Sequence, residues 1–114
     1  MANLKITPVK CEVNTLTKIE AASASTEGME FKLPRTSDEY VIVLAQNTDT
    51  ANAHTFTMKA PTNGSYCASD SDETISLDSG ETAIFRFESA RFANNDGTVN
   101  CVADNAAVKV AVIY

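Results

Sequence analysis

The sequence predicts an all-β protein: a single antiparallel β-sandwich or jelly-roll-like barrel with an extended N-terminal arm or loop. Three observations lead to this prediction. Apolar and polar residues alternate along several short segments. β-branched and aromatic residues gather in those segments, and clusters of Asn, Asp, Ser and Gly separate them at short intervals. The chain of 114 residues has the length of one domain and can bury a core of its own.

The N-terminal third, residues 1–38, is expected to form an arm or an edge strand followed by a loop. Its segment "KITPVKCEV" suits a strand only at a sheet edge or a bulge, because Pro8 cannot donate a backbone hydrogen bond. Residues 14–28 are small and polar, so we expect a mobile arm or loop that orders against another surface. The core strands are therefore expected within residues 39–114.

Three segments in residues 39–114 have strong strand patterns. "EYVIVLAQN" (39–47) is apolar on both faces and is predicted to be a central strand. "HTFTMKA" (54–60) places His54, Phe56, Met58 and Ala60 on one face and polar residues on the other. "AAVKVAVIY" (106–114) aligns its valines on one face and is largely apolar on the other. Each is predicted to be a strand.

Clusters of turn-forming residues separate the predicted strands of this region. Asn and Asp side chains close turns by bonding their own backbone, and Gly supplies positive φ. The predicted turns are "NTDTAN" (47–52), "APTNGS" (60–65), "SDSDE" (69–73), "DSGE" (78–81) and "NNDG" (94–97).

The net charge of −6 argues against a nucleic-acid-binding protein, since binding to phosphates requires clustered Lys and Arg. The nine basic residues of this chain are scattered. No apolar run approaches the roughly 20 residues that span a bilayer, and the start "MANLKITPVK" lacks the apolar region of a secretory signal. We therefore expect cytoplasmic synthesis and neither a membrane nor a nucleic acid as partner.

The three cysteines, Cys11, Cys67 and Cys101, have no C-x-x-C spacing. In a chain made in the cytoplasm they are expected to be small buried hydrophobic residues. A disulfide between Cys67 and Cys101, formed after release from the cell, is the main alternative.

Few residues indicate chemistry. His54 is the one histidine and is expected in the core or a turn, because a zinc site would need further ligands from distant strands. The acidic segment "SDSDETISLDSGE" could supply oxygen ligands to Ca²⁺, but it lacks the EF-hand spacing and favours a solvated loop. No nucleophile elbow, P-loop or dinucleotide fingerprint is present. We therefore expect no catalytic residue, metal or cofactor.

The order of the C-terminal segments is similar to that of a known group of proteins. "EYVIVLAQNTDTANAHTFTMKA" is followed by "TISLDSGETAIFRFESARFANNDGTVNCVADNAAVKVAVIY". This series resembles the small head decoration, or cement, proteins of tailed bacteriophages that have a β-sandwich fold. The resemblance covers residues 39–114 and includes a strand ending in Asn, a Thr-rich strand, a corner "FESARF", a turn "DGTVN" and a Val-rich last strand.

The resemblance implies a non-enzymatic virion protein that binds and stabilises the outer surface of the capsid. The implied partners are the major capsid protein and further copies of the chain, in a trimer or a similar ring. In the corner, Phe87 and Phe92 would anchor the sandwich while the polar residues stay exposed. The candidate contact residues are Glu88, Arg91, Asn94 and Asn95 in the corner and Asp70, Asp72 and Glu73 in the acidic segment.

Two alternatives remain at this stage. One is a structural component of the phage tail or neck. The other is a carbohydrate-binding or adhesin module, because β-sandwiches host such functions too. Sugar platforms use exposed Trp and Tyr, whereas this chain has no Trp and places Tyr40 and Tyr114 in apolar strands, which disfavours the adhesin.

Overall fold

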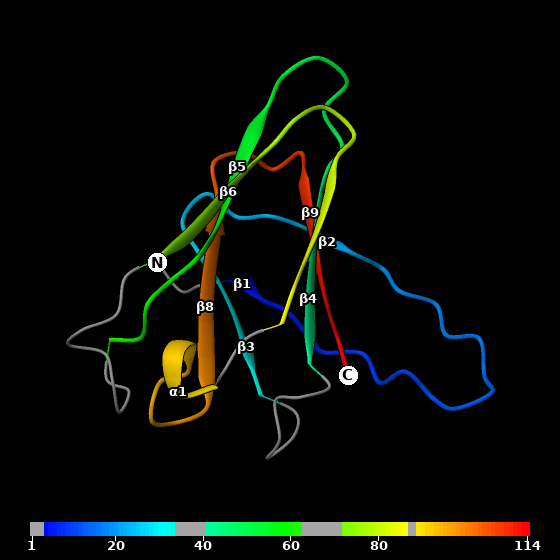
Figure 1. Ribbon diagram of the computed structural model, residues 1–114, viewed down its shortest axis with the longest axis vertical. Coiled ribbons are helices and arrows are strands. Elements are labelled where there is room, and N and C mark those ends of the chain that lie inside the picture. The colour runs from blue at the N-terminus through cyan, green and yellow to red at the C-terminus, as the bar shows by residue number, and fades with distance from the viewer. Residues whose placement is uncertain (1–3, 34–40, 63–71, 87–88) are drawn as a thin grey trace.

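The computed structural model shows two β-sheets packed face to face, which confirms the predicted β-sandwich (Figure 1). It describes residues 4–33, 41–62, 72–86 and 89–114. The strands pair antiparallel, apart from the short pair β1–β3 and an isolated bridge between Val9 and Ile113, which are parallel. Within the described residues, the helical structure is one turn, α1 (Ser89–Phe92).

The first sheet has five strands in the order β1-β3-β8-β5-β6. Their bounds are β1 (Leu4–Lys5), β3 (Met29–Lys32), β8 (Thr98–Ala103), β5 (His54–Met58) and β6 (Glu73–Leu77). The second sheet has four strands in the order β2-β9-β4-β7. These are β2 (Ala22–Ser23), β9 (Val108–Ile113), β4 (Ile42–Asn47) and β7 (Thr82–Phe85).

The core lies between the two sheets and follows the period of two along the strands. In β9, Val108, Val110 and Val112 are at most 1 % exposed. They face residues from the other sheet that are equally buried, among them Met29, Phe31, Met58 and Val99. The alternation in the sequence thus translates into one buried face on each sheet.

The three strands with strong sequence patterns are present. β4 is central, since it pairs with β9 on one side and β7 on the other. Its outer face is less covered than expected, because Ile42 and Leu44 are only half-buried and Gln46 is exposed. β5 buries Phe56 and Met58 on its predicted inner face, and β9 buries its valines.

The N-terminal third contributes more to the sandwich than its sequence indicated. β3, which the sequence analysis did not identify, is an interior strand of the first sheet and buries Met29 and Phe31. Within the predicted arm of residues 14–28, β2 pairs with β9, and Ala24 is buried. Ala22 and Ser23 are small, which allows β2 to lie close against β9. The part of the predicted arm without strand pairing therefore ends before β2.

The segment "TISLDSGETAIF" crosses from one sheet to the other. β6 is the last strand of the first sheet, and β7 is the last strand of the second. A turn over residues 78–81 joins them, with Gly80 at a φ of 80° and a hydrogen bond from its N–H to the carbonyl of Asn47. From this turn the two strands diverge (Figure 1).

Candidate interaction surface

The predicted corner is a compact structure built around Phe92. This side chain is 4 % exposed and meets the Phe85 ring edge to face, with 5.4 Å between the ring centroids. The guanidinium carbon of Arg91 lies 4.6 Å from the centroid of the Phe92 ring. Phe92 therefore anchors the corner as expected, while Phe87 lies outside the described residues.

Asn94 is buried rather than exposed, which contradicts its prediction as a contact residue. Its side-chain oxygen accepts hydrogen bonds from the Thr62 amide (2.8 Å) and hydroxyl (3.2 Å). Its side-chain amide donates to the Thr98 carbonyl at 3.1 Å. The side chain thus ties the corner to the segment after β5 and closes the turn, because buried polar groups require such partners. Asn95, next along the chain, is exposed.

Asp72, in the acidic segment, is held against the same end of the sheet. Asp72 accepts a hydrogen bond from the Ala60 amide at 2.7 Å and pairs with the Lys59 ammonium at 3.3 Å. The Ala60 amide first, and Lys59 next, lower the pKa of the Asp72 carboxyl from its usual value. Glu73 belongs to strand β6 rather than to the predicted turn over residues 69–73, because it pairs with Met58 of β5.

Some of the predicted contact residues therefore lie at one end of the five-stranded sheet. Asp72, Glu73, Arg91 and Asn95 surround the end of β5 and the corner, and the positive charge of Arg91 also lowers the pKa of Asp72. Asp70 and Glu88 lie outside the described residues. This end of the sheet is therefore polar and charged.

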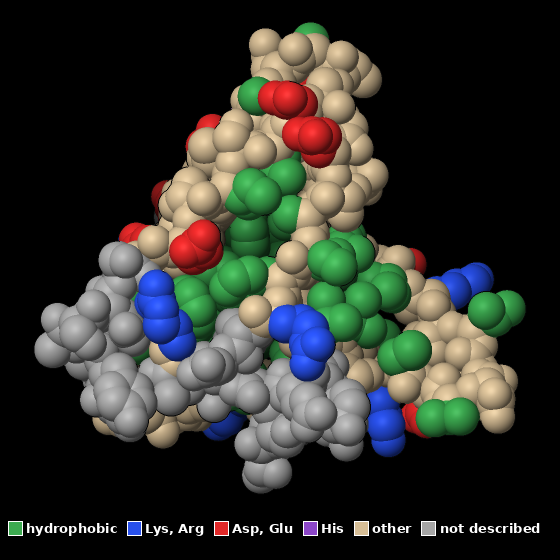
Figure 2. Space-filling model, viewed as in Figure 1, with side chains coloured by type: hydrophobic (Ala, Val, Ile, Leu, Met, Phe, Trp, Pro, Cys, Tyr) green, Lys and Arg blue, Asp and Glu red, His purple; other side chains and the backbone are tan. Residues whose placement is uncertain are grey.

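Two apolar features escaped the sequence analysis. The first is a wedge between the diverging strands β6 and β7, where hydrophobic side chains are visible from outside (Figure 2). It contains an apolar pocket of about 100 Å³ lined by Val43, Phe56, Met58, Ile75, Ala83 and Phe85. Ile75 faces inward in register with Phe56, yet it is 45 % exposed, because no strand of the described chain closes the sandwich here.

The second feature is the exposed segment of residues 12–21, called here the arm. Leu16 is fully exposed and Val13 is 86 % exposed. Hydrogen bonds fix both ends of this segment to β9: Cys11 N–H to the Tyr114 carbonyl at 2.6 Å, and Ala24 N–H to the Val108 carbonyl at 2.8 Å. In the sequence, the signal for these two residues is the contrast between a large apolar side chain and its mostly polar neighbours.

His54 lies at the opposite end of β5 and has a structural environment. Its Nε2 lies 2.8 Å from Asp49 Oδ2, and its Nδ1 lies 3.2 Å from Asp104 Oδ1. Backbone amides, first that of Ala51, and the His54 ring hold the pKa of Asp49 well below its usual range. His54 is thus the first residue of a strand and only partly buried, rather than the core or turn residue that was expected, and its ring connects the loops that carry Asp49 and Asp104.

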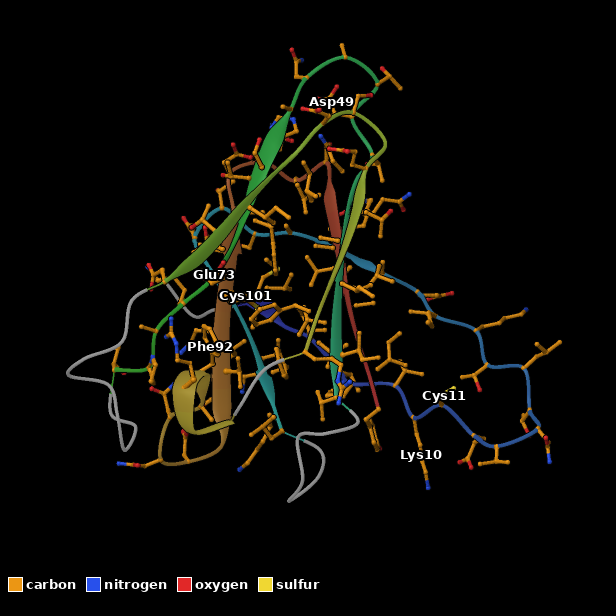
Figure 3. All side chains as sticks on the ribbon, viewed as in Figure 1. Lys10, Cys11, Asp49, Glu73, Phe92 and Cys101 are labelled. Atoms are coloured by element: carbon orange, nitrogen blue, oxygen red, sulfur yellow. The ribbon has the colours of Figure 1, made fainter. Side chains whose placement is uncertain are left out.

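Two of the cysteines differ in their surroundings. Cys101 is 1 % exposed in β8, and burial raises the pKa of its thiol to about 12. Cys11 is exposed at the start of the arm, which contradicts its prediction as a buried residue (Figure 3). Its immediate neighbours, Lys10 and Glu12, are charged and exposed. Both thiols are free in the structure, and Cys67 lies outside the described residues.

In the described part of the chain, no three His, Cys, Asp or Glu side chains are grouped to hold a metal ion. No helix within these residues has the length and apolar character needed to cross a membrane. In comparisons with protein-family models, curated proteins and solved structures, no match to this chain was found.

Proposed function

We propose that this protein is a non-enzymatic structural protein of a tailed bacteriophage that binds and stabilises the outer surface of the capsid. The observation that supports this most is the charged end of the β-sandwich, where Asp72, Glu73 and Asn95 are exposed around the corner. Exposed charged and polar groups of this kind form the rim of protein interfaces. The resemblance of residues 39–114 to decoration proteins supplies the identity of the partner, the major capsid protein.

Such a function needs contact area rather than a reactive site. A specific interface covers about 800 Å² on each partner. Many copies on one shell add avidity without stronger single contacts. The proposed contact residues are Asp70, Asp72, Glu73, Glu88, Arg91 and Asn95. Asn94 is not among them, because it is buried and both ends of its amide are bonded within the chain.

Co-sedimentation tests this proposal. The purified protein is mixed with expanded shells that lack decoration, with unexpanded shells and with tails of the phage that encodes it. We expect it to pellet with expanded shells at a saturable stoichiometry. Pelleting with tails alone would instead assign it to the tail or neck, and binding to none of the three would refute a virion role.

A pair of charge variants tests the end of the five-stranded sheet that carries the proposed contact residues. Asn95→Lys adds a positive charge beside the corner, whereas Thr50→Lys adds the same charge in the exposed turn at the other end of β5. A charge at the rim of an interface alters association with a charged partner. We expect Asn95→Lys to change the apparent affinity for expanded shells several-fold and Thr50→Lys to leave it unchanged. Equal effects of the two variants would remove the corner from the proposal.

A further inference from the structure

We infer that the arm of one copy docks into the β6–β7 wedge of a second copy, with Leu16 entering the apolar pocket. The two surfaces have matching chemistry and lie on one chain, but they face different directions. This contact joins copies of the chain to one another and does not require the capsid.

The wedge is a site open to an additional segment. Among the described residues, β6 pairs with β5 and β7 pairs with β4, and neither has a second partner strand beside the wedge. Free strand edges accept extended segments from other chains. The pocket of about 100 Å³ is smaller than the roughly 150 Å³ cavity that holds a benzene ring. It therefore suits a single aliphatic side chain.

The arm offers such a side chain. Leu16 is fully exposed, with Val13 three residues before it and the partly exposed Ile19 three residues after it. All residues from Cys11 to Glu20 are exposed. Side chains alternate along an extended segment, so Leu16 can enter the pocket while Val13 and Ile19, each three residues away, lie on the other face.

The arm cannot reach the wedge of its own chain. Its ends are bonded to β9 on the side where β2 forms the sheet edge, whereas β7 forms the opposite edge of that sheet. In Figure 3, Lys10 and Cys11, which directly precede the arm, lie on one side of the molecule, and Glu73 of β6 lies on the other. The occupant of the wedge is therefore the arm of another copy.

The arm carries one cation, Lys18, together with two carboxylates, Glu12 and Glu20, so it can supply one ion pair to this contact. In the other copy, Glu73 of β6 is exposed and lines the pocket. Lys18 lies in the arm two residues after Leu16, and no ion pair to it is found among the described residues. When Leu16 enters the pocket, the Lys18 ammonium can approach the Glu73 carboxylate.

Contact between an arm and a wedge joins two different surfaces, so successive copies associate head to tail. Such contacts close into a ring when the rotation between copies permits.

Sedimentation equilibrium of the purified protein, without shells, tests the inference. Measurements extend to about 1 mM so that a weak site is detected. Two variants remove one surface each: Leu16→Asp places a charge on the arm, and Ala83→Leu fills the pocket while keeping the wedge apolar. Thr50→Asp is the control, since it adds the same charge in an exposed turn outside both surfaces. Thermal unfolding confirms that each variant is folded.

We expect wild type and Thr50→Asp to self-associate, and both surface variants to associate at least about tenfold more weakly. An equimolar mixture of the two variants should form dimers that grow no further, because one contributes an intact wedge and the other an intact arm. A monomeric wild type, a surface variant that associates like wild type, or a mixture that stays monomeric would each overturn the inference. A Leu16→Asp protein that is monomeric but still pellets with expanded shells leaves the proposed function intact.

Discussion

Asn94 and Asn95 are neighbours with the same side chain and opposite surroundings. Asn94 is buried and bonded to Thr62 and Thr98, whereas Asn95 is exposed. Asn94→Ala removes three part-buried hydrogen bonds, each with a net contribution of about 0.5–1.5 kcal/mol, so we expect a loss of about 1–3 kcal/mol in the free energy of unfolding. Asn95→Ala should change it by less than about 0.5 kcal/mol. Urea unfolding of the two variants measures both values, and equal losses would contradict the structural role of Asn94.

The thiols of Cys11 and Cys101 offer a second test at this scale. The thiolate is the reactive form of cysteine. Cys101 is buried, and this burial raises the pKa of its thiol to about 12. We therefore expect iodoacetamide to modify Cys11 in the native protein at neutral pH and to leave Cys101 unmodified until the protein unfolds. Peptide mass spectrometry distinguishes the two sites. Equal rates of modification at both would show that β8 is not buried as described.

At the scale of elements, strands with regular alternation could be predicted and their partners could not. β4, β5 and β9 bury the faces that the sequence indicated, because the side-chain period of two survives in any sheet. β3 has only four residues, Met29 to Lys32, and was missed although Met29 and Phe31 alternate with charged residues. The turn at residues 78–81 was predicted, but nothing local indicates that it joins strands of different sheets.

The turn that carries Asp49 gives a prediction on pH. Backbone amides and His54 lower the pKa of Asp49 in the folded protein, relative to about 3.9 in the unfolded chain. Its contribution to stability is therefore present above about pH 4 and is lost as the pH falls through the folded value. We expect wild type to be more stable than Asp49→Asn at pH 5 and the difference to shrink toward pH 2. Thermal unfolding across this range measures it, and a difference independent of pH would contradict the assignment.

At the scale of the whole molecule, the sandwich and the polar corner could be predicted from the sequence, whereas the exposed apolar surfaces could not. The alternation of apolar and polar residues in β6 predicts that Ile75 is a core residue. It is nevertheless 45 % exposed, because β6 diverges from β7 (Figure 1). Leu16 lies in a segment without periodicity, so its exposure follows from the way both ends of the arm attach to β9. Long-range connections of this kind depend on how the sheets assemble.

The central claim, that the protein stabilises an expanded capsid, is tested most directly by the heat stability of the shell itself. A ligand that binds only the assembled shell raises its disassembly temperature as binding saturates. Calorimetry of expanded, undecorated shells would be recorded with increasing amounts of the protein. The account predicts that the disassembly temperature rises and levels off at the stoichiometry found by co-sedimentation. An unchanged temperature at saturating protein would contradict it.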